Sequence, residues 1–333
     1  MASSSPRIAI LSFAHMHAYS YVTAMTRRDD VTFVGIWDED PARGQAQAQE
    51  HGTRFYENLD SLLSEKLDGI MVCSDNAGHQ HLVEKAASAG PAAILCEKPI
   101  STTLEGARAM IAACEKAGVF LGIAFPCRYS PAFEKARIAV KEGQLGDILA
   151  IRATNHGVCP FGWFVEKERS GGGAVIDHTV HVADLNRRLL GKEAVEVYAE
   201  TGNGFYHQEW EDTGFLTVTY QGGIFTTLDT SWSRPRKSFP TWGDVTMEIV
   251  GTGGVISIDM FSQALTLYSE KAGRSQLVGW GSNTDAGLVN DFLARARGEE
   301  TETLASGYDG LKALEVALAA YRSADAKQPV SLA

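Results

Sequence analysis

The sequence predicts an α/β protein of two domains: a doubly wound parallel sheet first, then an α/β domain built on a large, open, mainly antiparallel sheet. Up to about residue 125, six short apolar segments alternate with helical segments, which is typical of parallel strands joined by helices. Later segments are longer, alternate apolar and polar residues, and follow one another through glycine-rich turns. A chain of 333 residues is long enough for two domains, which we place at residues 1–125 and 126–333.

The first domain is expected to contain six short strands with helices between them. The strands are predicted at residues 7–12, 31–38, 53–55, 69–73, 92–96 and 119–124. The helices are predicted in a stretch that ends near residue 28, from residue 41 onward, and at residues 59–65, 80–89 and 103–117. Open α/β sheets bind ligands at the carboxyl ends of their strands, so residues that follow a strand are the first site candidates.

The second domain is expected to begin with a helix at residues 131–142, a strand at 148–156 and a helix at 177–190. Alternating runs then predict strands at residues 195–201, 214–220, 224–232, 245–250, 255–260 and 264–268. Glycine-rich turns at residues 221–223 and 251–254 join neighbouring strands, so the sheet is expected to be antiparallel with one face available for packing. Two helices, at residues 286–297 and 307–324, close the chain.

Composition narrows the class of partner. The net charge is −11 without any Lys/Arg-rich run, which argues against a nucleic-acid partner. The five cysteines are odd in number and widely spread, which indicates reduced thiols. Their spacing matches no zinc-ligand motif. We recognise no leader segment and no apolar run of the ~20 residues that span a bilayer. We therefore expect a cytoplasmic protein without a membrane partner.

The first turn after a strand lacks the Gly-x-Gly-x-x-Gly pattern by which a doubly wound sheet approaches a dinucleotide pyrophosphate. Ser12 and Ala14 occupy the first two glycine positions and are small enough to keep much of that approach, whereas His17 occupies the third. His15 and His17 either contribute donors to a phosphate or cap the first helix. Both interpretations stay open.

Asp38 is stronger evidence for a dinucleotide, because it ends the second strand, where a carboxylate accepts both ribose hydroxyls and repels a 2′-phosphate. This favours NAD over NADP. The alternative role of Asp38 is to cap the helix that starts at Pro41. The neighbouring Arg43 means that NADP is not excluded.

Two further segments follow apolar strands. Ser74, Asn76 and His79 come after the fourth strand and are either site residues or turn and cap residues. Glu97-Lys98-Pro99 follows the fifth strand, and Pro99 ends it because proline lacks an amide donor and has a fixed φ. Lys98 is therefore expected at the mouth of the parallel sheet.

Five motifs occur along the chain in a recognisable order. They are Asn76-Ala77-Gly78-His79, Glu97-Lys98-Pro99, Arg128-Tyr129-Ser130-Pro131, Gly171-Gly172-Gly173 followed by Asp177 and His181, and Tyr308-Asp309-Gly310. As an ordered set, which spans nearly the whole chain, they resemble the glucose-fructose oxidoreductase/inositol dehydrogenase (Gfo/Idh/MocA) family. The resemblance implies an N-terminal Rossmann domain, an oligomer (dimer or tetramer) formed through the C-terminal sheet, and NAD(P)-dependent oxidation or reduction of a sugar or polyol carbon.

The resemblance also assigns site residues by position. Lys98 matches the family's active-site lysine, Asp177 and His181 match its acid and catalytic histidine, and Asn76 and His79 match its nicotinamide-side turn. The cofactor is expected to be NAD, with NADP not excluded. The residues expected to bind it are Ser12, Phe13, Ala14, His15, Asp38, Ser74, Asn76, His79, Glu97 and Lys98. The chain departs from the family in its glycine-free first turn.

The spacing of Asp177 and His181 suits alcohol oxidation, since residues four apart project from one face of a helix. His181 is expected to take the hydroxyl proton, Asp177 to hydrogen-bond the imidazole or the substrate, and Lys98 to stabilise the alkoxide. The competing interpretations are a surface Asp–His pair and a salt bridge between Lys98 and Glu97. We expect no metal, because among the crevice histidines only His181 has ligand-like spacing to an acid.

Arg128, His156 and Trp163 are added as substrate candidates alongside Asp177 and His181, because a tryptophan can stack on a sugar while polar groups bind its hydroxyls. Trp163 is also consistent with ordinary packing.

Two other functions remain open. One is a redox-neutral glycosidase or epimerase that passes through a transient keto-sugar, and the other is a nucleotide- or sugar-binding protein without catalysis, which the missing glycines suggest.

Overall fold

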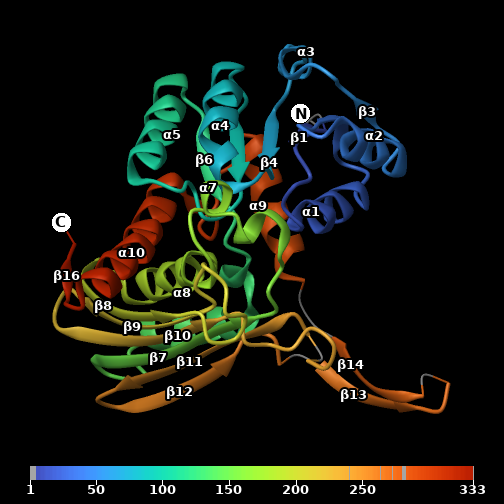
Figure 1. Ribbon diagram of the computed structural model, residues 1–333. Helices are drawn as coiled ribbons and strands as arrows, with labels where there is room; N and C mark the ends of the chain where they lie inside the picture. The colour runs from blue at the N-terminus through green and yellow to red at the C-terminus, as the bar shows by residue number, and fades with distance from the viewer. Residues whose placement is uncertain (1–4, 240, 263, 272, 280–282, 333) are drawn as a thin grey trace. The chain divides into compact units, whose positions relative to one another are not determined.

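The computed structural model describes residues 5–239, 241–262, 264–271, 273–279 and 283–332, which divide into two compact units (Figure 1). Unit 1 comprises Met1–Pro126, Glu168–Gly171 and Thr284–Leu314. Unit 2 comprises Cys127–Lys167, Gly172–Asn283 and Glu315–Ala333. Among the described residues, none of the helices combines the length and the apolar character needed to cross a membrane.

Unit 1 contains the predicted doubly wound sheet, with strand order β15-β6-β5-β4-β1-β2-β3. Its strands are β1 (Arg7–Leu11), β2 (Thr32–Trp37), β3 (Arg54–Phe55), β4 (Gly69–Val72), β5 (Ala93–Cys96), β6 (Phe120–Ile123) and β15 (Ala305–Ser306). All neighbours pair in parallel except β15, which runs antiparallel to β6. The central strands β4 and β5 are buried throughout, because helices cover parallel sheets on both faces.

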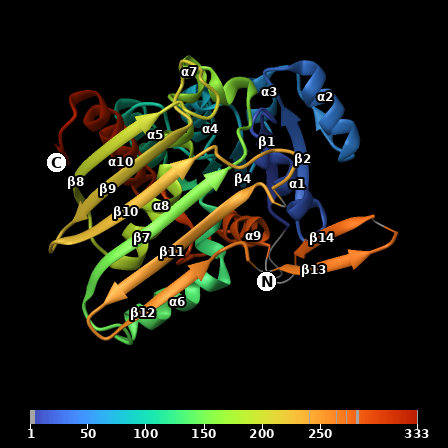
Figure 2. The same ribbon diagram turned by 60° about the horizontal axis from the view of Figure 1, so that its bottom comes forward.

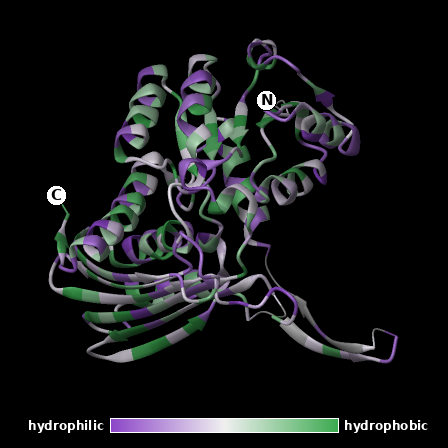
Figure 3. Cartoon of the chain, in the orientation of Figure 1, coloured by the Kyte–Doolittle hydropathy of each residue, from purple (hydrophilic) through white to green (hydrophobic). Residues whose placement is uncertain are grey.

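Figure 3 shows apolar and polar residues alternating along the helices of unit 1, and the residues that the longer helices bury are mostly apolar. The helices are α1 (His17–Thr26), α2 (Pro41–Glu50), α3 (Leu59–Leu63), η1 (Asn76–Gly78), α4 (His79–Ser88), α5 (Leu104–Ala117) and α9 (Thr284–Ala296). Helix α9 packs on α1, β4 and β5 of this unit, although the unit 2 segments Cys127–Lys167 and Gly172–Asn283 precede it in the chain. The pairing of β15 with β6 was not predicted.

Unit 2 is built on a second seven-stranded sheet, with order β12-β11-β7-β10-β9-β8-β16, which Figure 2 shows from its open side. Its strands are β7 (Ile148–Gly157), β8 (Ala194–Gly202), β9 (Thr213–Tyr220), β10 (Ile224–Ser231), β11 (Gly243–Gly251), β12 (Gly254–Asp259) and β16 (Val330–Ser331). Only β7 and β10 are parallel, so the predicted mainly antiparallel sheet is confirmed.

One face of this sheet is covered by α8 (Ala174–Leu190), which contacts β7, β9 and β10. Helix α8 begins three residues before the predicted start. The unit also contains η2 (Pro126–Tyr129), α6 (Pro131–Lys141), η3 (Gly162–Val165), α7 (Lys167–Ser170) and α10 (Gly307–Ala326), of which η2, α7 and α10 cross a unit boundary. The predicted strand at residues 264–268 is observed as β13 (Ala264–Ser269). Among the strands that the structure describes it pairs only with β14 (Arg274–Gly279), as a separate hairpin.

Candidate functional site

The turn after β1 is tight although it contains no glycine. Ser12 has φ 72°, in the left-handed region that favours glycine, and it stands where the first fingerprint glycine would be. Its hydroxyl accepts a hydrogen bond from the Ala14 amide at 3.0 Å, and the Phe13 amide donates to Asp38 Oδ2 at 2.8 Å. The His15 amide donates to the Cys73 carbonyl at 2.9 Å. The turn is therefore held largely by its own hydrogen bonds and by β2 and β4.

Asp38, which follows β2, is buried and has several donors around it. Besides the Phe13 amide, it accepts from the Asp40 amide at 2.8 Å and from Arg43 Nε at 2.9 Å, and its second oxygen lies 2.5 Å from Arg43 Nη2. The cap of α2 is Asp40, which accepts from the amides of Ala42 and Arg43. The alternative that Asp38 serves as the cap of this helix is therefore wrong.

The turn after β4 holds the segment that follows β5. His79 is fully buried, and its Nδ1 donates to the Pro99 carbonyl at 3.0 Å. Burial lowers the pKa of His79, so its imidazole is neutral and Nε2 is an acceptor. Asn76 donates to the Ser170 carbonyl at 2.7 Å, while Ser74 donates to the Asp75 carbonyl at 2.9 Å.

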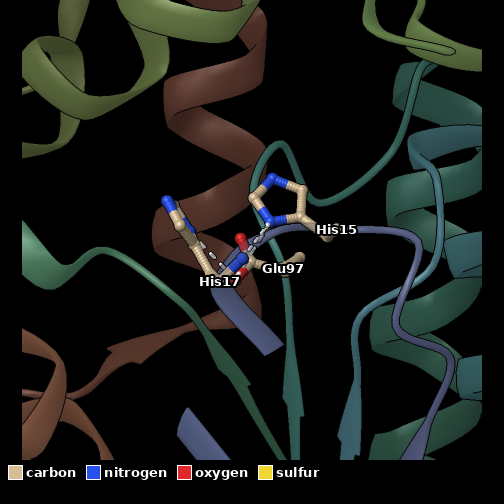
Figure 4. A group of neighbouring side chains, drawn as sticks. All are labelled: His15, His17 and Glu97. Atoms are coloured by element: carbon tan, nitrogen blue, oxygen red, sulfur yellow. Dashed lines mark hydrogen bonds and ion pairs between the residues drawn. The ribbon is translucent and has the colours of Figure 1, made fainter. Parts of the chain in front are cut away.

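Glu97 and Lys98 lie at the end of β5, and both are buried. Glu97 Oε2 accepts from the Lys98 amide at 3.1 Å, and Oε1 lies 3.2 Å from His17 Nδ1 and 3.7 Å from His15 Nδ1 (Figure 4). Burial alone would raise the pKa of Glu97, but His15, His17 and Lys98 together lower it well below its usual range. Glu97 thus stays ionised between the two histidines.

The start of α8 is held from two distant segments of unit 2. Glu211 Oε1 accepts from the Gly173 amide at 2.6 Å and from the Tyr321 hydroxyl at 2.6 Å, and that hydroxyl also accepts from the Ile176 amide at 3.1 Å. A carboxylate is favourable there because the helix N-terminus carries partial positive charge. A Cβ at Gly172 would lie 2.1 Å from the Tyr321 hydroxyl, so the glycine motif allows this close approach. These contacts fix the residue at which α8 begins, and therefore the position of Asp177 in its first turn.

Asp177 and His181 lie one turn apart on α8, as predicted. The Trp232 indole donates to Asp177 Oδ2 at 3.2 Å, and His178 Nε2 lies 3.3 Å from the same oxygen. His178 Nδ1 in turn donates to the Asn155 carbonyl at 3.0 Å. His181 is largely buried. The Trp232 indole therefore orients the carboxylate, and His178 adds a donor only when its ring is doubly protonated.

His156 lies on the open face of the second sheet, away from α8. The side chain of its neighbour Asn155 reaches the His178 carbonyl, and successive strand residues point to opposite faces. His156 contacts Asp244 at 2.7 Å and Asp229 at 3.1 Å. Burial lowers its pKa, but hydrogen bonds to these carboxylates outweigh that effect and raise the pKa to about 9. The structure does not bring His156 together with Asp177.

The other two substrate candidates have structural partners. Arg128 forms a bidentate, buried ion pair with Asp184 of α8, with Nε 2.7 Å from Oδ2. Trp163 stacks on Phe164 with ring centroids 3.8 Å apart, in an aromatic cluster that includes Trp232. The pair between Arg128 and Asp184 was not expected from the sequence, whereas packing was one of the two interpretations of Trp163.

Sequence reasoning missed the residues that position α8, namely Trp232, Glu211 and Tyr321. Trp232 lies 55 residues from Asp177, and Tyr321 lies 110 residues from Glu211. A buried indole or phenol needs a hydrogen-bond partner, but the sequence does not indicate which one it finds. No local signal in the sequence could have identified these contacts.

Comparisons with known proteins identify related family models for both halves of the chain. Residues 7–125 match the model of an oxidoreductase family with an NAD-binding Rossmann fold, and residues 133–257 match the GFO/IDH/MocA C-terminal domain. D-apiose dehydrogenase of Paraburkholderia graminis is 30% identical, over 96% of this chain and 86% of its own length. 2,7-Anhydro-N-acetylneuraminate hydratase of Escherichia coli is 32% identical, over 73% of this chain and 65% of its own length.

A solved structure shares the fold. The structure of GenD2 from gentamicin A biosynthesis, in complex with NAD, superposes with a TM-score of 0.87 and covers 99% of this chain and 97% of its own. Its sequence is 24% identical, so it supports the fold alone.

The residues of unit 1 fit a dinucleotide. Asn76 Oδ1 and His79 Nε2 are buried acceptors without a hydrogen-bond partner among the described residues. Buried polar atoms of this kind are uncommon, and a bound polar group would satisfy them. An amide such as the nicotinamide carboxamide supplies suitable donors. Asp38 is in the place of a ribose-binding carboxylate, after β2, but four donors already occupy its two oxygens, so ribose hydroxyls would replace its hydrogen bonds with Arg43.

Proposed function

The chain belongs to the Gfo/Idh/MocA family of oxidoreductases, and from this premise we propose that it transfers a hydride between NAD and a hydroxyl or keto carbon of a sugar, polyol or sugar derivative. The proposal rests mainly on the residue ranges of the two family matches. The first, over residues 7–125, contains Lys98, and the second, over residues 133–257, contains Asp177 and His181. The D-apiose dehydrogenase relative supports a sugar as substrate.

In this proposal the chain's own residues handle the proton and the charge. His181 accepts the hydroxyl proton during oxidation and returns it during reduction. Asp177, oriented by Trp232, hydrogen-bonds the substrate hydroxyl or the imidazole. Lys98 stabilises the developing alkoxide. The bound nicotinamide supplies the hydride acceptor or donor.

We infer a preference for NAD over NADP from Asp38. Its carboxylate suits the ribose hydroxyls and repels a 2′-phosphate. Arg43 pairs with this carboxylate and opposes the preference, because a guanidinium attracts phosphate. Comparing the initial rates with NAD and with NADP at equal concentration tests the preference, and a higher rate with NADP would contradict it.

A redox-neutral reaction is the second candidate function, and one relative favours it. The E. coli relative is named a hydratase, which implies no net oxidation of its substrate. In such a reaction bound NAD would take the hydride from a ring carbon while His181 took the hydroxyl proton, the neighbouring position would then react, and both would be returned to the carbon and its oxygen. The non-catalytic alternative has less support, because the relatives are oxidoreductases and other enzymes.

We also infer that the chain forms a homo-oligomer through the open face of the second sheet. Phe215 and Phe225 lie on that face with 60% and 52% of their surface exposed, and Tyr198 lies there as well. Exposed aromatic groups of this kind are typical of interfaces. Light scattering should give a dimer or tetramer, and Phe215→Asp should lower the mass to that of a monomer. A wild-type monomer would contradict the inference.

The test of function is a screen of sugars, inositols and glycosides with NAD, which follows absorbance at 340 nm and analyses products by mass spectrometry. Net oxidation predicts NADH and keto-sugar in equal amounts. Product that forms only when NAD is present, without accumulated NADH, indicates the redox-neutral reaction. If NAD does not bind, both proposals fail.

A further inference from the structure

Three side chains that sequence spacing did not connect meet at the start of α1 and the end of β5. We propose that His15, His17 and Glu97 form a binding site for one divalent transition-metal ion, with Zn²⁺ as the representative ion. This goes beyond the proposed hydride transfer, which uses no metal. The sequence led us to expect no metal, because among the crevice histidines only His181 has ligand-like spacing to an acid. Glu97, 80 residues from His17, was not considered as a ligand.

The distances are close to those that a metal would impose. The ligand atoms all lie within 4.8 Å of one another, and Glu97 Oε1 is 3.2 Å from His17 Nδ1 and 3.7 Å from His15 Nδ1. Tetrahedral bonds of about 2.0–2.2 Å place ligand atoms about 3.3–3.6 Å apart. Small side-chain rotations would therefore bring all three to an ion. Figure 4 shows both imidazoles directed toward the same carboxylate.

The donor set suits such an ion chemically. Imidazole nitrogen and carboxylate oxygen are ligands for zinc and its neighbours in the first transition series. One oxygen of Glu97 is oriented by the Lys98 amide at 3.1 Å, so the other is presented to the histidines. Histidines that coordinate an ion are neutral, so the ion then supplies the positive charge that the buried Glu97 carboxylate needs. The His17 amide donates to His15 Nδ1 at 3.2 Å, and binding through that nitrogen replaces this hydrogen bond.

The cluster has one open side. The side chains of Glu97 and His15 are 0% and 1% exposed, whereas that of His17 is 30% exposed. An ion can therefore enter past His17. Three protein ligands leave a tetrahedral ion with one position for water or another ligand, as in zinc sites that are not purely structural.

The competing explanation is a metal-free ion pair between a protonated histidine and Glu97, which needs no ion. Titration of the full chain with metal separates the two. The protein is purified without a polyhistidine tag, stripped with a chelator and titrated with Co²⁺ and then Zn²⁺. We expect one ion per chain, visible Co²⁺ absorption bands that Zn²⁺ removes, and a Zn²⁺ dissociation constant below about 1 µM.

Variants assign the binding to these residues. His17→Ala, His15→Ala and Glu97→Gln should each weaken Zn²⁺ binding by ~100-fold or more, since even outer-shell changes cost 10–100-fold. His81→Ala is the matched control, because His81 is an exposed histidine on α4 of the same unit. Thermal melting confirms folding, and His17→Ala, at the most exposed ligand, serves if a buried variant unfolds. Absence of saturable binding, or equal losses in the His81 and His17 variants, would overturn the proposal.

Discussion

Trp232→Phe isolates the hydrogen bond that orients Asp177. The indole donates to Asp177 Oδ2 at 3.2 Å, and phenylalanine keeps an aromatic ring but lacks the donor. His178 also contacts that oxygen, at 3.3 Å, but its Nδ1 proton goes to the Asn155 carbonyl. His178 Nε2 therefore donates only when the ring is doubly protonated, whereas the indole donates at any pH.

The expected loss follows from the charge of the acceptor. A hydrogen bond to a charged group contributes about 1.5–3 kcal/mol, so losing it corresponds to a fall in kcat of ~10- to 100-fold if Asp177 acts in the reaction. The dissociation constant of NAD, measured by the quenching of tryptophan fluorescence, should change less than ~2-fold, because Asp177 is not among the expected cofactor ligands.

The matched control is Trp210→Phe. Trp210 packs against Trp232 with ring centroids 5.5 Å apart, so this variant perturbs the same aromatic cluster. Both variants should lower the melting temperature, whereas only Trp232→Phe should lower kcat strongly. Equal kcat in the two variants would refute the orienting role of Trp232.

Three further predictions concern the remaining residues. His181→Gln and Lys98→Ala should each lower kcat by at least ~100-fold in the assay with the screened substrate, and unchanged turnover would remove that residue from the mechanism. Asp38→Ala should weaken NAD binding ~10-fold or more in a fluorescence titration and relax discrimination against NADP, and an unchanged preference would mean that another residue contacts the ribose. Because the pKa of His156 is raised to about 9, its contribution to stability is complete below pH ~6.5 and disappears as pH rises through 9. His156→Gln should therefore lower the free energy of unfolding by about 1–3 kcal/mol at pH 6 and much less at pH 10 in urea titrations, and equal losses at both pH values would contradict this.

Much of the fold could be predicted because buried parallel strands are short apolar runs with clear boundaries. The expected strand at residues 92–96, for example, is β5 (Ala93–Cys96). The pairing of strands was harder to predict, because an alternating pattern shows which residues share a face of a strand but not which strand lies beside it. The strand at residues 264–268 was therefore correctly placed but forms a separate hairpin, and the two residues of β15 carried no signal.

The local placement of the candidate residues could be predicted from the sequence. Asp177 and His181 share a helix, and Lys98 follows a strand. Long-range contacts were not predictable, since the indole of Trp232 and the carboxylate of Glu97 find partners 55 and 80 residues away. The side of the sheet on which His156 lies also depends on where α8 packs, which the alternation of the strand alone does not determine.

The most direct test of the proposed reaction follows one atom. The substrate identified in the screen is labelled with deuterium at its carbinol carbon and incubated with the enzyme and NAD. Our account predicts deuterium in the reduced cofactor, by mass spectrometry of NADH, during the first turnover. Product formation with no deuterium in the cofactor at any time would contradict hydride transfer.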